Sequence, residues 1–182
     1  MPEKDVKGLI LMGGQSIRMG TDKAFVQWQG KTLLERSIEN LSGITEDIYL
    51  SVNTDQHEAL NDSYNCILDK YPDKGPLSGI LSALETLNDD LIVLAVDMPE
   101  VNHSMLCRLI SNSTKVRAYQ SQENQWEPLP SFWPKTITEI LSSYFSSNRL
   151  SINGFLKTHG ETVISNTNSN SFKNLNSPDD LS

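Results

Sequence analysis

A glycine-rich segment near the amino terminus has the composition of a site for phosphate groups. Residues 11–24 read Leu-Met-Gly-Gly-Gln-Ser-Ile-Arg-Met-Gly-Thr-Asp-Lys-Ala and overlap the end of a largely apolar run, residues 7–12. Glycines let the backbone approach a ligand closely and take positive φ angles, so that successive amides can point at phosphate oxygens. Arg18 can bind two phosphate oxygens at once, and Lys23 can follow negative charge as it moves onto a leaving group. The segment therefore predicts a site at which a polyphosphate binds and reacts.

Two better-known phosphate loops do not match the chain. The dinucleotide-binding pattern G-x-G-x-x-G does not occur. Gly30-Lys31-Thr32 is similar to the end of a P-loop, but Phe25 stands where that motif requires glycine. We interpret residues 30–32 as a turn into a helix, and the sequence argues against a GTPase switch.

Apolar runs and amphipathic stretches alternate through the first 110 residues. Strands are expected at residues 7–12, 47–53, 66–68 and 91–96, and helices at residues 32–41, 56–60, 77–87 and from Asn102 or His103 to Ile110. Such alternation predicts βαβ units around a mostly parallel sheet, with the most apolar run, residues 91–96, as its central strand.

The second half of the chain is less regular. We expect strands at residues 117–121, 129–133 and 162–164, and helices at residues 136–145 and 150–158. Residues 122–128 are predicted as a polar hairpin and residues 165–171 as a flexible low-complexity tract, after which Ser177 begins a terminal helix.

Polar residues or glycines follow each strand predicted in the first half. They are Gly13-Gly14, Asn53, Asp69 and Asp97. Ligands of parallel α/β sheets bind beyond the carboxyl ends of the strands, so these residues are expected to meet in one crevice. Mg²⁺ prefers one or two carboxylates together with waters and substrate phosphates, and Asp97 is the strongest candidate for such a ligand.

Composition narrows the class of protein. The chain has 182 residues, the size of one ordinary domain, and is 37% hydrophobic and 21% charged, as soluble globular proteins are. Its net charge of −8 disfavours nucleic acid or an anionic membrane as partner, and no apolar run reaches the ~20 residues that span a bilayer. Two cysteines are too few for a disulfide framework, so a reducing cytoplasm is the expected location.

The whole of residues 11–24 resembles the nucleotide-binding signature of the nucleoside-triphosphate transferases, L-x-G-G-x-S-x-R-M-G-x-D-K. Within that family the chain is most similar to the molybdenum cofactor guanylyltransferases. Further matches follow in order at residues 75–79 (G-P-L-S-G), 96–99 (V-D-M-P), 127–130 (E-P-L-P) and 174–181 (N-L-N-S-P-D-D-L). Met12 departs from the small residue usual before the glycine pair, and its side chain either crowds the base or fills space.

The resemblance implies a Rossmann-like, three-layer α/β/α nucleotide-diphospho-sugar transferase fold. Residues 1–182 would form one domain, with a nucleotide-binding amino-terminal half and a molybdopterin-binding carboxyl-terminal half. The implied reaction transfers GMP from GTP to the terminal phosphate of molybdopterin, or its molybdenum-loaded form, and releases pyrophosphate. Contact with the molybdenum-insertion protein and with apo-molybdoenzymes is also implied.

The same resemblance assigns roles to individual residues. Catalysis would rest on Arg18, Lys23 and Asp97, with Asp97 also holding Mg²⁺ and Asp22 orienting Lys23 or Arg18. The triphosphate would lie on the backbone around Gly13, Gly14, Ser16 and Gly20. The residues expected to bind the base are Leu11, Asn53, Asp69, Leu77 and Gly79, and those expected to bind molybdopterin are Asn174 and Asn176.

Two chemical arguments refine these assignments. A carboxylate such as Asp69 can accept from both N1–H and N2–H₂ of guanine, which favours guanine over other bases. Trp126 and Trp133 could stack on a pterin, but tryptophans in strands more often lie in the core, and we expect them there.

Other functions are compatible with parts of this pattern. A related enzyme could use CTP, or a sugar phosphate as acceptor, although the G-P-L-S-G segment favours guanine and the chain is short for a sugar-nucleotide enzyme. A non-catalytic GTP-binding relative is a further alternative, against which the presence of Arg18, Lys23 and Asp97 argues.

Overall fold

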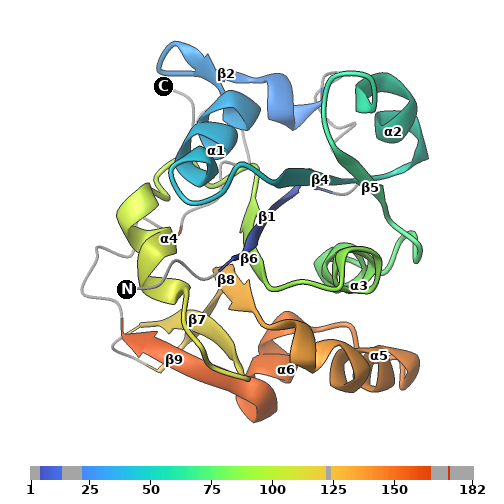
Figure 1. The fold of residues 1–182 in the computed structure, drawn as a ribbon, viewed down its shortest axis with the longest axis vertical. Coiled ribbons are helices and arrows are strands. Elements are labelled where there is room, and N and C mark those ends of the chain that lie inside the picture. Colours follow the sequence, from blue (N-terminus) through green and yellow to red (C-terminus); the bar gives the residue numbers. More distant parts are fainter. Residues whose placement is uncertain (1–4, 14–21, 122–123, 165–171, 173–182) are drawn as a thin grey trace.

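A seven-stranded sheet between two layers of helices forms the body of the protein (Figure 1). The computed structural model describes residues 5–13, 22–121, 124–164 and 172. Within this part of the chain the strand order is β5-β4-β1-β6-β8-β7-β9. The predicted three-layer arrangement is confirmed, and the apolar strand β6 is the fourth of the seven strands, as its composition indicated.

The first half of the chain supplies four parallel neighbours. They are β1 (Lys7–Leu11), β4 (Ile48–Val52), β5 (Cys66–Leu68) and β6 (Leu91–Ala95). Leu11 pairs with Ser51 on one side and with Ala95 on the other, so the carboxyl ends of β1, β4 and β6 finish at the same level. This register brings the residues that follow these strands to one edge of the sheet.

The second half adds three strands, of which one reverses direction. β8 (Trp126–Trp133) runs antiparallel to both β6 and β7 (Val116–Gln120), and β9 (Gly160–Ile164) is parallel to β7. Trp133 pairs with Leu91 at the amino end of β6. The amino-terminal part of β8 therefore lies towards the carboxyl end of β6, and Trp133 lies at the opposite edge.

Helices cover both faces of the sheet. On one face α1 (Leu33–Ser42) and α4 (His103–Leu109) pack over one core cluster, to which α2 (Thr54–Leu60) contributes Leu60. On the other face α3 (Pro76–Leu87), α5 (Thr138–Ser146) and α6 (Ile152–His159) pack over a second cluster. A short 3₁₀ turn, η3 (Lys135–Ile137), precedes α5.

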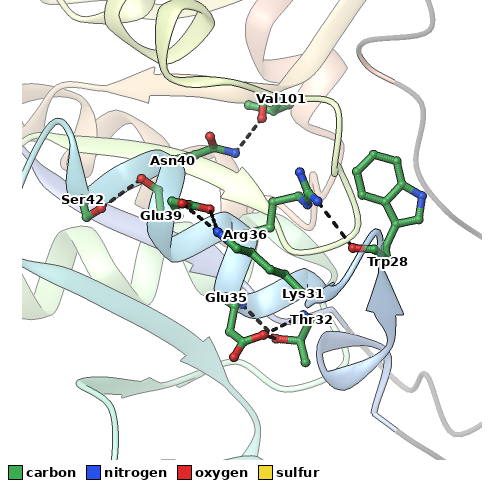
Figure 2. Close-up of polar contacts among 9 residues, drawn as sticks. All are labelled: Trp28, Lys31, Thr32, Glu35, Arg36, Glu39, Asn40, Ser42 and Val101. Carbon is green, nitrogen blue, oxygen red and sulfur yellow. Dashed lines mark hydrogen bonds and ion pairs between the residues drawn. The ribbon is translucent and has the colours of Figure 1, made fainter.

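The start of α1 is fixed by local hydrogen bonds (Figure 2). The backbone N–H of Glu35 donates to Thr32 Oγ1 at 3.1 Å, and the N–H of Thr32 donates to Glu35 Oε2 at 2.7 Å, which is a complete capping box. Further along the helix, Asn40 Nδ2 donates to the carbonyl of Val101 at 2.7 Å. That bond ties α1 to the loop that follows β6.

A two-stranded hairpin, not predicted from the sequence, precedes α1. Its strands are β2 (Gln27–Trp28) and β3 (Lys31–Thr32). The turn residues Gln29 and Gly30 have φ angles of 49° and 83°, the left-handed pair that a tight hairpin requires. Gly30 lies in a turn and Thr32 is the N-cap of α1, as the interpretation of residues 30–32 required, but Lys31 and Thr32 form strand β3 and are not part of the turn.

Several predicted boundaries move. α2 begins two residues earlier than expected because Asn53 is its N-cap. β8 begins at Trp126 and takes in the end of the predicted hairpin. The low-complexity tract and the terminal helix at Ser177 lie outside the described residues. No helix in the described part of the chain is long and apolar enough to cross a membrane.

Candidate functional site

A cavity of ≈ 430 Å³ lies at the edge where the parallel strands end. The strand ends contribute Leu11, Met12, Gly13, Ser51, Val52, Asn53, Asp69, Ala95, Val96 and Asp97, and the other lining residues are Lys23, Thr54, Gln56, Pro72, Asp73, Gly75, Pro76, Gly79 and Leu129. Seven residues that the sequence assigned to the site are therefore brought together: Leu11, Gly13, Lys23, Asn53, Asp69, Gly79 and Asp97.

Lys23 and Asp97 form an ion pair within the cavity. Lys23 belongs to the short helix η2 (Lys23–Phe25), whose next residue, Ala24, is completely buried in the core. The ammonium Nζ lies 2.9 Å from Asp97 Oδ2, although the two residues are 74 positions apart in the sequence. Only 15% of the Lys23 side chain and 19% of the Asp97 side chain are exposed, so solvent screens this pair less than a surface pair.

The second carboxylate oxygen of Asp97 takes no part in the ion pair with Lys23. Asp97 Oδ1 is buried and accepts no hydrogen bond from any of the described residues. A buried anionic oxygen without a partner is costly, and a bound cation removes that cost. Among the described residues, no group of three or more His, Cys, Asp or Glu side chains could hold a metal ion. Mg²⁺ does not require such a group, because it binds through one or two carboxylates together with waters and substrate phosphates. The donor set at Asp97 thus fits Mg²⁺.

Glycines on two sides of the cavity allow close approach of the backbone. Gly13, directly after β1, has a φ of 87°, a conformation that L side chains rarely adopt. On α3, a Cβ added at Gly79 would overlap Ser51 Oγ and would lie 3.3 Å from Leu11 Cδ2. The absence of a side chain at Gly79 therefore lets α3 pack closely against β1 and β4 beside the cavity.

Asp69 is held firmly by the first turns of α3. Its Oδ2 accepts from the hydroxyl of Ser78 at 2.6 Å. Its Oδ1 accepts from the N–H of Tyr71 at 2.9 Å and lies 3.4 Å from Ser82 Oγ. Asp69 is thus oriented at the cavity by contacts within the protein, and its expected double contact with guanine stays a prediction.

Asn53 has a structural task as well as a place in the cavity. Its side-chain oxygen accepts from the N–H of Gln56 at 2.8 Å and caps α2. Gln56 also lines the cavity and was missed by the sequence reasoning. The spacing N-x-x-Q of Asn53 and Gln56 is that of a capping box, and this signal could have identified Gln56 as the partner of Asn53.

Some assigned side chains lie elsewhere. Leu77 is completely buried in the core cluster on the α3 side and is not one of the residues lining the cavity. Met12 lines the cavity but is 1% exposed and packs into the opposite cluster, so its side chain fills space in the core. Trp133 is buried and stacks on Phe155 with ring centroids 5.6 Å apart, which confirms its expected place in the core. Trp126 is half-buried and packs against the cluster on the α3 side.

Several assignments fall on residues outside the described ranges. In the glycine-rich segment these are Gly14, Ser16, Arg18 and Gly20. Near the carboxyl terminus they are Asn174 and Asn176. The roles assigned to these six residues stay predictions.

Comparison with known sequences identifies relatives along nearly the whole chain. The family model described as the MobA-like NTP transferase domain matches residues 8–163. The molybdenum cofactor guanylyltransferase of Cereibacter sphaeroides is 31% identical over 96% of this chain and 92% of its own length. The enzyme of the same name from Haemophilus influenzae is 30% identical over 97% of this chain and 95% of its own length.

Solved structures share the fold. Molybdopterin-guanine dinucleotide biosynthesis protein A from Archaeoglobus fulgidus superimposes with a TM-score of 0.80 at 24% identity, covering 97% of this chain and 95% of its own. The 4-diphosphocytidyl-2C-methyl-D-erythritol synthase of Anaerococcus prevotii superimposes with a TM-score of 0.72 at 13% identity, covering 98% and 93%. The same fold thus occurs in proteins whose names refer to different nucleotides, so the choice of nucleotide depends on the site.

Proposed function

Because this chain belongs to the MobA-like NTP transferase family, we propose that it is a molybdenum cofactor guanylyltransferase. It transfers GMP from GTP to molybdopterin, or to its molybdenum-loaded form. An oxygen of the terminal phosphate of molybdopterin attacks the α-phosphorus of GTP and forms a new P–O bond. The bond from that phosphorus to the bridging oxygen of the β-phosphate breaks, and pyrophosphate leaves with the electron pair.

The observation that carries the proposal is the Lys23–Asp97 pair in a cavity at the ends of parallel strands. Phosphoryl transfer requires little covalent chemistry from a protein, but it requires two anions to be brought together and the leaving group to be stabilised. Lys23 supplies a positive charge that neutralises charge developing on pyrophosphate. Bound at Asp97, Mg²⁺ would shield the phosphate oxygens of the nucleotide.

The nucleotide base is proposed to bind beside α3. Asp69 presents its carboxylate to the guanine edge, and Leu11 and Gly79 contribute surface without polar side chains. The glycine segment that begins at Gly13 binds the triphosphate through backbone amides, with Arg18 contributing its guanidinium. On this proposal residues 1–182 act as one domain, in which the first half binds GTP and the second half binds molybdopterin.

The location is proposed to be the cytoplasm. The two cysteines, Cys66 and Cys107, are both free, as in proteins of a reducing compartment.

Pyrophosphate release tests the proposal directly. The purified protein is incubated with Mg²⁺, molybdopterin and either GTP, CTP, ATP or UTP, and released pyrophosphate is measured against a reaction without molybdopterin. We expect release that depends on molybdopterin and a kcat/KM for GTP at least tenfold above that for the other nucleotides. Preference for CTP would identify a cytidylyltransferase, and GTP binding without pyrophosphate release would identify a non-catalytic relative.

A further inference from the structure

The segment that carries Lys23 is attached to α2 by a side-chain contact outside the Lys23–Asp97 pair. Asp22 is the N-cap of η2, and its Oδ1 accepts from the N–H of Ala24 at 3.0 Å. Its Oδ2 accepts from Gln56 Nε2 at 2.7 Å. One oxygen of Asp22 thus orders its own helical turn, and the other joins this turn to a helix 34 residues further along the chain.

The amide of Gln56 is bound at both ends. Its Oε1 accepts from the N–H of Asn53 at 3.2 Å, and its Nε2 donates to Asp22. The two ends are not interchangeable, because a flipped amide would place an NH₂ group against the N–H of Asn53 and an oxygen against the Asp22 carboxylate. The capping box of α2 therefore selects the orientation in which Gln56 donates to Asp22.

The contacts form a continuous chain. They run from the first turn of α2 through Gln56 and Asp22 to the neighbouring residue, Lys23, and from its ammonium to Asp97. Gln56, Lys23 and Asp97 all line the cavity.

From this arrangement we infer that Gln56 is a positioning residue for the transfer reaction. It holds Asp22, and through Asp22 it fixes the backbone from which the Lys23 ammonium reaches the reacting phosphates. The inference rests on the proposed function. Each polar end of the Gln56 amide makes one hydrogen bond within the protein, and these two bonds carry the positioning task. A small displacement of a charged group at a reaction centre can cost up to about a hundredfold in rate.

Exchanging the carboxylate of Asp22 and the amide of Gln56 tests this inference. In Gln56→Glu a carboxylate faces the Asp22 carboxylate, and in Asp22→Asn an amide nitrogen faces the Gln56 amide nitrogen. In the double variant Asp22→Asn/Gln56→Glu the amide and the carboxylate have changed places. The new amide at position 22 still caps Ala24 and donates to the new carboxylate at position 56. That carboxylate still accepts from the N–H of Asn53, so each hydrogen bond of the parent can re-form.

Steady-state kinetics with GTP and molybdopterin, and thermal unfolding, are measured for all variants. We expect each single exchange to lower kcat about tenfold to a hundredfold while KM for GTP changes less than about threefold. The double variant should recover kcat to within about threefold of the parent. Asp55→Asn, which removes an exposed carboxylate from the same turn of α2, is the matched control and should keep the parental kcat.

Three other results would overturn the inference. Single variants that keep the parental kcat would remove any positioning role, and a change confined to KM for GTP would indicate direct binding of the nucleotide. A double variant as slow as the singles would show that the Asp22–Gln56 bond is not the cause. If Gln56→Glu does not fold, Gln56→Met removes both hydrogen bonds at similar volume and without charge, and the same loss of kcat is expected. A parent protein without turnover contradicts the proposed function itself, a separate outcome.

Discussion

The two halves of the sheet contribute differently to the cavity. In the first half β1, β4, β5 and β6 all run in one direction, and polar residues or glycines follow their carboxyl ends around the cavity. In the second half the large aromatic residues Trp133 and Phe155 are buried against each other. The reversal of β8 explains the contrast, because it places Trp133 beside Leu91 at the opposite edge and leaves Leu129 at the cavity.

This contrast separates the residues proposed to serve the reaction from residues buried in the core of the second half. Burial raises the pKa of Glu127 in the amino-terminal part of β8, and burial also raises the pKa of the Tyr119 hydroxyl on the neighbouring strand. The Tyr119 hydroxyl donates to the carbonyl of Met105 at 2.9 Å, a contact that joins β7 to α4. Substitutions at the cavity should accordingly change the kinetic constants, whereas substitutions in the core of the second half should change the free energy of unfolding.

Replacement of Trp133 should have the largest effect on stability. Trp133→Ala removes a completely buried ring and its stacking on Phe155, and should lower the free energy of unfolding by about 3–5 kcal/mol. At temperatures where the variant is folded, KM for GTP should stay within about twofold of the parent. Urea unfolding and pyrophosphate release measure the two quantities. Ile140→Ala, at a side chain 44% exposed in the same half, is the control, and a large rise in KM for Trp133→Ala would contradict the comparison.

Replacement of Asp97 should mainly lower kcat, in contrast to the loss of stability expected at Trp133. Asp97→Asn removes the charge that pairs with Lys23 and the anionic ligand proposed for Mg²⁺, so kcat should fall about 10²–10³-fold. Asp89→Asn is the matched control, because Asp89 lies just before the amino end of the same strand, β6, near Lys7. Pyrophosphate release is again the measurement. Parental turnover by Asp97→Asn would show that the assigned metal ligand is wrong.

At Gly79 a smaller effect is expected, on both the free energy of unfolding and KM for GTP. Gly79→Ala introduces a Cβ that overlaps Ser51 Oγ, and such overpacking costs about 1–3 kcal/mol. Because α3 must then move away from β1 and β4, KM for GTP should rise several-fold. Adding Ser51→Ala removes the overlapping oxygen and should restore part of both losses, as measured by thermal unfolding and initial rates. Failure of the second substitution to help would rule out this overlap as the cause.

The smallest effect is expected at the capping box of α1 (Figure 2). Its residues, Thr32 and Glu35, are not among those that line the cavity. Thr32→Ala should lower the free energy of unfolding by about 1 kcal/mol and leave kcat unchanged. Hydrogen bonds from the backbone N–H and the hydroxyl of Thr32 lower the pKa of Glu35 below its ordinary value of 4.5. Its carboxylate therefore contributes stability above that value, and the contribution disappears as the pH falls through the lowered pKa.

Denaturation of the parent and of Glu35→Gln across this pH range measures the contribution of Glu35. The difference between the two proteins should be largest near neutral pH and should vanish at strongly acidic pH. A difference that grows as the pH falls would contradict the assigned hydrogen bonds.

The local sequence determined most of the elements and the main members of the site. The apolar run at residues 91–96 predicted the central strand, observed as β6 (Leu91–Ala95), because a strand buried on both faces has no polar positions. The polar residues and glycines after each strand identified Gly13, Asn53, Asp69 and Asp97, because parallel strands bring their carboxyl ends to one edge.

Tertiary structure decided the features that depend on distant pairs. The reversal of β8, the contact of Lys23 with Asp97 and the contact of Asp22 with Gln56 join residues far apart in the chain, and no local periodicity specifies such pairs. The same is true of Asp69, whose free acceptor positions depend on Ser78, Tyr71 and Ser82. Residue types determined the chemistry of the site, whereas the packing of separate elements fixed which of their atoms are free to act.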